Sequence, residues 1–158
     1  MFKNGTLSIG FIGLWDAVSV LVNESIDSIE MMKKNYNLAY SIIKSMRVYT
    51  DQITNTEQLN FSLLASSAEG VTGNFAQYDS MNLGMKYDVC KKGFYTNSFH
   101  VPVDLSVNYR EKIDMEGKFH RLCNGGSITY IELNEMPGIN VEAVKEIVEY
   151  AYENDCNY

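Results

Sequence analysis

The chain has little of what marks membrane, secreted or nucleic-acid-binding proteins. Its 158 residues include two prolines, two histidines and one tryptophan. No apolar run approaches the roughly 20 residues that a membrane span needs, and no basic segment, apolar stretch and cleavage site mark a secretion signal. The net charge is −7 and no basic stripe is present, which argues against a nucleic-acid partner. We therefore expect neither a membrane nor a nucleic acid as partner.

The three cysteines, Cys90, Cys123 and Cys156, are scattered and form no CxxC pair. An odd, scattered set fits free thiols in a reducing compartment, so we predict a cytoplasmic protein. With the two histidines they lack the clustered spacing of a zinc site, and we predict no metal ligand in this chain. His120 lies three residues before Cys123 on an expected helix, the arrangement of a weak thiolate–imidazole candidate. A cysteine behind a helical histidine is ordinary, and we assign no catalytic residue.

Hydrophobic residues make up 46% of the chain, enough for one domain with a real core over residues 1–158. Hydrophobic periodicity and turn residues predict three strands and five helices. The strands are expected at 6–12, 59–65 and 127–133, and the helices at 14–22, 26–50 with Ser25 as cap, from the turn after residue 65 to about Gly84, 106–123 with Ser106 as cap, and after Asn140 as cap. Gly93, Pro102 and Pro137-Gly138 are the expected breaks. This order predicts an α/β fold with mostly parallel strands and covering helices, although three strands leave the sheet incomplete.

The most informative stretch is 59–75, where an alternating strand enters a turn of small residues and continues as a helix. Exposed backbone N–H groups at such a helix start form a ready anion site. Ser66 and Glu69 have the spacing of a capping box, which would satisfy the same donors. Both interpretations stay open on local sequence.

The segment 94–103 concentrates aromatic and hydrogen-bonding side chains between predicted elements. Such loops are often functional, and packing against the loop's own domain is the commoner explanation. Trp15, the one tryptophan, is expected to be a packing anchor.

Four segments of the chain, taken in order, carry a resemblance: Gly5–Leu14, Phe61–Phe75, Tyr95-Thr-Asn-Ser-Phe-His-Val-Pro-Val103 and Phe119–Leu133. Together they resemble the later part of the catalytic barrel of anaerobic (class III) ribonucleoside-triphosphate reductases. One departure is the turn Ala65-Ser-Ser-Ala-Glu69, where the family's pattern is Ala-Thr-Pro-Ala-Glu. The missing proline loosens the turn, while a hydroxyl remains.

The resemblance implies a ten-stranded α/β barrel of the glycyl-radical type. Such an enzyme replaces the ribose 2′-hydroxyl of a ribonucleoside triphosphate by hydrogen, with formate as the usual reductant. Its glycyl radical is installed by an activase that uses S-adenosylmethionine and an iron–sulfur cluster. The loop bearing the thiyl cysteine, the nucleotide-sensing cone, the zinc knuckle and the radical-bearing tail have no counterpart in residues 1–158. We therefore expect a fragment of the reductase that does not turn over alone.

The resemblance also implies site residues. The turn is expected to hold the substrate phosphates with magnesium, through Ser66, Ser67, Ala68, Glu69 and Gly70. Active-site lining is expected from Asn97, Ser98 and His100. The alternative is a truncated, non-catalytic module that binds a partner through the exposed edges of strands 6–12 or 127–133. A homodimer is a further expected assembly.

Overall fold

The computed structural model describes residues 4–83, 91–133 and 140–156, except the side chain of Glu69. In chain order the elements are β1 (Thr6–Phe11), α1 (Leu14–Val22), α2 (Ile29–Glu57), β2 (Asn60–Ala65), α3 (Glu69–Asn82), α5 (Tyr109–His120) and α6 (Val141–Glu153). The expected helix end near Gly84, Cys90 and the expected break at Pro137-Gly138 lie outside the described residues.

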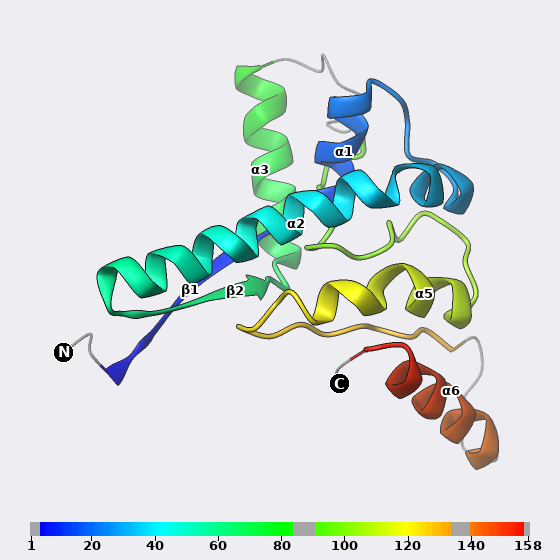
Figure 1. Cartoon of the computed structure of the whole chain (residues 1–158). Coiled ribbons are helices and arrows are strands. Elements are labelled where there is room, and N and C mark those ends of the chain that lie inside the picture. Colours follow the sequence, from blue (N-terminus) through cyan, green and yellow to red (C-terminus); the bar gives the residue numbers. More distant parts are fainter. Residues whose placement is uncertain (1–3, 84–90, 134–139, 157–158) are drawn as a thin grey trace.

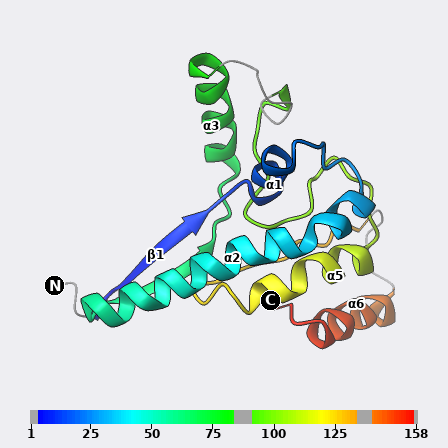
Figure 2. The same ribbon diagram turned by 45° about the horizontal axis from the view of Figure 1, so that its top comes forward.

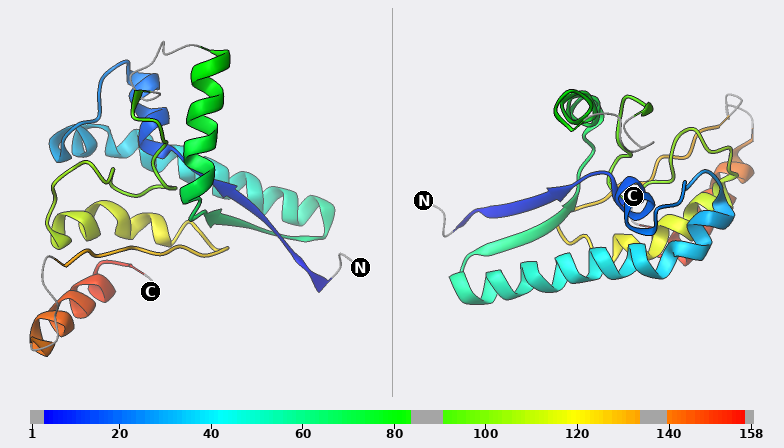
Figure 3. Two further views of the ribbon diagram at one scale, coloured as in Figure 1. Left: turned by 180° about the vertical axis from the view of Figure 1, so that it is seen from behind. Right: turned by 90° about the horizontal axis from the view of Figure 1, so that it is seen from above.

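The two strands form a parallel pair that runs beside the C-terminal half of α2 (Figures 1 and 3). Thr6 pairs with Asn60 and Phe11 with Ala65. Parallel strands need a crossover, and here α1 and α2 supply it. The α/β class and the parallel direction are confirmed, whereas the described sheet has two strands and shows no ten-stranded barrel.

The long helix α2 begins three residues later than predicted. Ser28, not Ser25, is its N-cap and accepts a hydrogen bond from the Met31 N–H at 3.3 Å. The predicted first residue, Ile26, is 6% exposed and belongs to the core ahead of the helix. The helix also continues to Glu57, past the predicted end at residue 50.

The helix α5 likewise begins later than the predicted cap at Ser106. Asn108 forms a capping box with Glu111, and the helix ends at His120 rather than at Cys123. An amide side chain that can bind the third residue of the helix outweighs the earlier hydroxyl residue.

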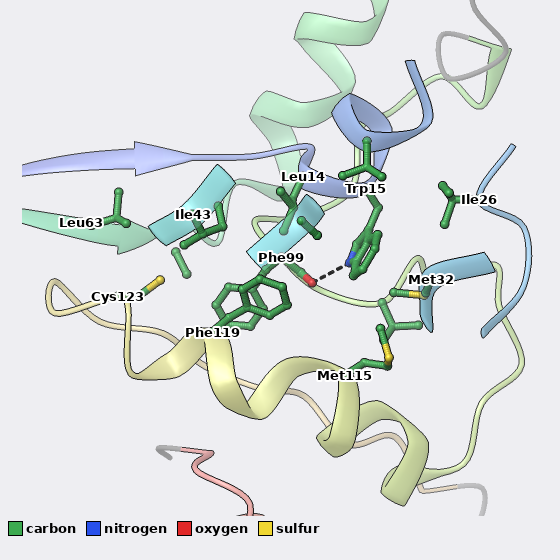
Figure 4. Close-up of a cluster of buried hydrophobic side chains, with 14 residues drawn as sticks. Leu14, Trp15, Ile26, Met32, Ile43, Leu63, Phe99, Met115, Phe119 and Cys123 are labelled. Atoms are coloured by element: carbon green, nitrogen blue, oxygen red, sulfur yellow. Dashed lines mark hydrogen bonds between the residues drawn. The ribbon is translucent and has the colours of Figure 1, made fainter. Parts of the chain in front are cut away.

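Aromatic rings from distant parts of the chain meet in the core between α1, α2 and α5 (Figure 4). The rings of Phe99 and Phe119 stack at 5.3 Å between centroids, and Trp15 meets the Phe119 ring edge-on at 6.5 Å. The Trp15 indole Nε1–H donates to the Phe99 carbonyl oxygen at 2.9 Å. Trp15 is therefore a packing anchor, as predicted.

The predicted strand at 127–133 is wrong. This segment runs alongside α5 without strand pairing (Figures 1 and 3), and only Gly126 bridges to Leu64 of β2. The Asn124 side chain accepts the Leu63 N–H at 2.9 Å, and the Gly125 N–H donates to the Leu63 carbonyl at 2.7 Å. A Cβ at Gly125 would lie 2.9 Å from that same oxygen. Because Gly125 has no Cβ, the chain can lie close against Leu63 of β2. It forms a turn there and not a third strand.

The helices α3 and α6 lie at the periphery. α3 rises away from the strands, and α6 packs beside α5 (Figures 1 and 2). Asn140 caps α6 as predicted, by accepting the Ala143 N–H at 3.1 Å. No side chain of α6 is buried, and its apolar face borders a groove shared with Ile113 and Ile131. Among the described helices, none combines the length and the hydrophobicity that crossing a membrane requires.

Candidate functional site

Two groups of sequence-predicted site residues meet beyond the carboxyl end of β2. The Asn97 side-chain oxygen accepts the backbone N–H of Ala68 at 3.1 Å. Ala68 is the N-cap residue of α3 and belongs to the turn 66–70. The expected phosphate-binding turn and the expected lining segment are therefore in direct contact, although 29 residues separate them in sequence.

The capping-box interpretation required Ser66 to be the N-cap of this helix, and Ser66 does not hold that position. α3 begins at Glu69, and its N-cap, Ala68, has no side chain that can cap it. The Ser66 hydroxyl lies against β1 instead, since a Cβ built on Gly10 would come 2.1 Å from Ser66 Oγ. A Cβ built on Gly70 would meet no atom within 4 Å. The first turn of α3 is therefore open to a ligand on the side of Gly70. Ser67 in this turn is also exposed.

A cleft of about 560 Å³ adjoins the contact between Asn97 and Ala68. It is lined by α3, the segment 94–103, α5 and the segment 130–132. Its rings and polar groups include Phe94, Asn97, His100, Lys112, Tyr130 and Glu132. Aromatic walls with a few placed polar side chains are typical of sites for small organic ligands.

Ser98 does not line this cleft. It is 0% exposed, and its hydroxyl has no hydrogen-bond partner among the described residues. Its backbone has φ 37°, in the left-handed region that residues other than glycine rarely adopt. The Ser98 carbonyl accepts the Leu14 N–H at 3.1 Å, so the start of α1 holds this residue in place.

The start of α1 also holds the neighbouring part of the cleft wall. Gly13, with φ 72°, donates its N–H to the Thr96 carbonyl at 2.7 Å. One carboxylate oxygen of Asp16 accepts both the Thr96 N–H at 2.7 Å and the Thr96 hydroxyl at 2.6 Å. The Tyr95 hydroxyl donates to Asp79 of α3 at 2.6 Å, which ties the same wall to a second helix.

A buried polar network lies behind the cleft, centred on Glu116 of α5, which is 0% exposed. Glu116 Oε2 lies 3.1 Å from His100 Nδ1 and accepts the Thr129 hydroxyl at 2.7 Å, while Oε1 accepts the Val101 N–H at 2.9 Å. The three partners come from the segments that precede and follow α5 in sequence. A buried carboxylate is tolerated when donors satisfy it in this way.

We did not predict Glu116 from the sequence, although a local signal exists. Glu116 stands three residues after Ile113 and four before His120, on the helix face that is otherwise buried. A carboxylate at a core-facing helix position needs partners, and His100 is one of only two histidines that could supply an imidazole.

His120 is engaged away from Cys123. Its Nε2 lies 2.8 Å from the Thr129 hydroxyl, and its Nδ1 lies 2.8 Å from the Ser127 hydroxyl. Burial raises the pKa of the Cys123 thiol to about 12. A thiol with that pKa stays protonated at neutral pH, so the pair offers no thiolate nucleophile.

The comparisons with known proteins agree along the whole chain. The pattern of the family described as "Anaerobic ribonucleoside-triphosphate reductase" matches residues 1–158. This chain belongs to that family. Proteins of this name from Salmonella typhimurium and from Enterobacteria phage T4 are each 32% identical to it, over 160 and 156 residues. The alignments include 98% of this chain in both cases, and 22% and 24% of the two relatives.

The chain thus spans about a quarter or less of these reductases. Solved structures agree on the fold. An anaerobic ribonucleotide reductase matches with a TM-score of 0.75 at 20% identity, over 96% of this chain and 24% of that one. The Thermotoga maritima reductase in complex with dATP and CTP matches with a TM-score of 0.70 at 21% identity, over 91% and 24%. Matches along the whole chain do not favour the alternative of a stand-alone interaction module.

The zinc that the family resemblance implies finds no fit within the described residues. No group of three or more His, Cys, Asp or Glu side chains in residues 4–83, 91–133 and 140–156 could hold a metal ion. Burial raises the pKa of the Cys156 thiol to about 11, which further disfavours the thiolate that zinc binds.

Proposed function

We propose that this chain forms part of the ten-stranded catalytic barrel of an anaerobic ribonucleoside-triphosphate reductase and that its cleft contributes to the substrate site. The observation that carries the proposal is the contact of Asn97 with the N-cap residue of α3, at the border of the cleft. It joins a helix start, which suits phosphate, to a cavity with aromatic and polar walls, which suits a nucleoside.

The phosphates would bind at the turn that contains Ser66, Ser67, Ala68, Glu69 and Gly70. Backbone N–H groups at the start of a helix and the positive end of its dipole attract anions. The Ala68 N–H already donates to Asn97, so a phosphate would use the other N–H groups of the turn. The turn contains no lysine or arginine. A triphosphate would therefore bind here together with magnesium.

The nucleoside would lie in the cleft. Phe94 and Tyr130 offer ring faces, and Asn97 and His100 offer hydrogen-bonding groups. Lys112 adds a cation at the same wall. The buried Ser98 would support the lining from behind, since its carbonyl accepts the Leu14 N–H at the start of α1.

The rest of the proposal concerns the whole enzyme. The reaction would reduce a ribonucleoside triphosphate to the deoxyribonucleotide by radical chemistry in the cytoplasm, with formate as reductant, a glycyl radical, a structural zinc and a radical-SAM activase. The enzyme would assemble as a homodimer. None of these groups is assigned to a residue of the described chain, and this chain alone is expected to be inactive.

A titration with magnesium–CTP tests the phosphate site. We expect the backbone amide resonances of residues 66–70 to shift progressively in the folded chain. Inorganic tripolyphosphate with magnesium should shift the same amides and leave those of residues 94–101 less affected, because it lacks the nucleoside. No shift at residues 66–70 in a folded sample would refute the assignment.

Gly70 offers a matched pair of variants for this titration, because a side chain there meets open space. Gly70→Asp places a carboxylate at the helix start, where it favours the helix dipole and repels phosphate. Gly70→Asn has nearly the same shape without the charge. We expect affinity for magnesium–CTP to fall at least about tenfold further in Gly70→Asp than in Gly70→Asn, which corresponds to about 1.4 kcal/mol. Equal affinities would place the phosphates elsewhere.

A further inference from the structure

The histidine in the cleft wall has two unequal ring nitrogens. The His100 side chain is 11% exposed, and its Nδ1 lies 3.1 Å from Glu116 Oε2. Its Nε2 has no hydrogen-bond partner among the described residues. The His100 ring also contacts the rings of Phe99 and Tyr130, at 5.2 and 5.9 Å between centroids. These contacts hold the imidazole in the wall, with one nitrogen committed and one available.

The hydrogen bonds around Glu116 have one consistent direction. The Val101 N–H can only donate, so Glu116 Oε1 is an acceptor. Thr129 has a single hydroxyl proton, which it donates to Glu116 Oε2. The Thr129 oxygen must then accept from His120 Nε2–H, and burial lowers the pKa of His120, which favours its neutral form.

The same accounting assigns the proton on His100. An ionised carboxylate only accepts hydrogen bonds, so the nitrogen that faces Glu116 must be a donor. We propose that Glu116 is a positioning residue that fixes the His100 proton on Nδ1 and thereby presents an unprotonated Nε2 to the cleft. The Nε2 lone pair then accepts a hydrogen bond from a ligand hydroxyl or N–H. That this ligand is a nucleotide, with the sugar hydroxyls as the donors, rests on the function proposed above.

Glu116→Gln should reverse the assignment. The Val101 N–H requires the carbonyl oxygen of the new amide, which turns the NH₂ group toward both His100 Nδ1 and the Thr129 oxygen. Thr129 then accepts from this NH₂ group and donates its own proton to His120 Nε2. An NH₂ group donates, so Nδ1 must accept and the proton moves to Nε2. Asp114→Asn is the matched control, because it removes one carboxylate charge from an exposed site on the same helix and keeps an acceptor for the Tyr150 hydroxyl.

Nitrogen-15 NMR of the imidazole rings in the full chain reads the tautomer directly. It is measured at about pH 9, well above the ordinary histidine pKa of about 6.5. In the wild type we expect a pyrrole-type Nδ1 and a pyridine-type Nε2 for His100. In Glu116→Gln we expect the reverse, a pyridine-type Nδ1 and a pyrrole-type Nε2. In Asp114→Asn we expect the wild-type pattern. A wild-type His100 that carries its proton on Nε2, or on both nitrogens, would overturn the proposal, as would an unchanged tautomer in folded Glu116→Gln.

If Glu116→Gln fails to fold, the tautomer of His100 in the wild type still tests the proposal. Thr129→Val gives a second test, because it removes one donor to Glu116 and keeps the carboxylate. It should retain the wild-type tautomer, and a reversal there would refute the role of Glu116.

A titration with magnesium–CTP separates this proposal from the proposed function. Loss of the Nε2 acceptor should weaken binding about 2- to 10-fold in Glu116→Gln relative to Asp114→Asn. Equal binding by both variants would refute the acceptor role of Nε2. A wild-type chain that shows the expected tautomer and does not bind CTP would count against the proposed function alone.

Discussion

Two glycines inside helices should respond in opposite ways to alanine. Alanine in a helix interior is favoured over glycine by about 0.5–1 kcal/mol, so helix propensity alone predicts stabilisation at both Gly73 of α3 and Gly117 of α5. A Cβ at Gly73 would have its nearest neighbour at 3.8 Å, an ordinary contact. A Cβ at Gly117 would lie 1.9 Å from the backbone oxygen of Asn154, just after α6.

The clash at Gly117 cannot be relieved by turning a side chain, because Asn154 contributes its backbone. Overpacking of this kind costs about 1–3 kcal/mol, more than the propensity gain. We therefore expect Gly117→Ala to lower the free energy of unfolding by about 1 kcal/mol, and Gly73→Ala to raise it by about 0.5–1 kcal/mol. Urea unfolding followed by the fluorescence of Trp15, which is 1% exposed, measures both.

A second readout locates the damage. Cys156 is 5% exposed, and its sulfur would lie 3.7 Å from the new Cβ. Displacement of residues 154–156 should expose this thiol, so a thiol reagent followed by peptide mapping should label Cys156 faster in Gly117→Ala than in Gly73→Ala. Equal stabilisation by both alanines, with Cys156 equally protected, would refute the close packing of α6 on α5.

Three further substitutions test the core and the cleft wall. Ser98→Gly should raise stability by about 1 kcal/mol relative to Ser98→Ala in urea unfolding, because glycine accepts φ 37° and the hydroxyl has no described partner. Trp15→Phe should cost about 2 kcal/mol by circular dichroism, since it leaves the buried Phe99 carbonyl without its donor, and a loss near zero would refute that bond. Folding raises the pKa of the Cys123 thiol from 9.0 to about 12. The protonated thiol therefore stabilises the folded state fully below pH 9, and this contribution to the free energy of unfolding is lost as pH rises toward 12. Cys123→Ala should therefore show a smaller loss of stability than the wild type across that range, and parallel pH profiles would contradict it.

Local sequence patterns predicted an element boundary correctly where a single residue or a clear apolar pattern determines it. The alternating pattern predicted β2 nearly to the residue, the apolar stretch 6–12 predicted β1 equally well, and the amide of Asn140 predicted the start of α6. The predicted N-caps of α2 and α5 were three and two residues too early, because neighbouring polar residues compete for the N-cap. Ser28 prevails over Ser25 since the intervening Ile26 packs in the core.

The error at 127–133 has a different cause. β-branched residues favour strands only where a partner strand is available, since strand preference reflects packing on a sheet. Here Thr129 uses its hydroxyl to join Glu116 to His120. Hydroxyl and β-branched composition is equally compatible with an extended segment held by side-chain hydrogen bonds.

The candidate site was only partly predictable for a related reason. The sequence indicated the turn 66–70 and the segment 94–103 separately, each from its own composition. Their contact through Asn97 and Ala68 depends on tertiary structure, which no local pattern encodes. Glu116 was missed because its role depends on His100, which lies 16 residues away in a segment without periodicity.

The cleft wall shows how an irregular segment can be held without a strand ladder. Buried backbone polar groups need partners, and in residues 96–101 side chains supply several of them. Trp15 donates to the carbonyl of residue 99, Asp16 accepts the N–H of residue 96, and Glu116 accepts the N–H of residue 101.

The segment also binds outward, since Asn97 accepts an N–H at the start of α3. Anchors on α1, α3 and α5 thus fix a stretch of six residues from three sides. A stretch constrained in this way can keep one residue in an unfavourable backbone conformation, because loss of any one contact leaves the others to hold it. The positive φ of Ser98 is then a consequence of the anchors around it. The positions of Asn97 and His100 at the cleft likewise depend on α1, α3 and α5, of which α1 does not line the cleft.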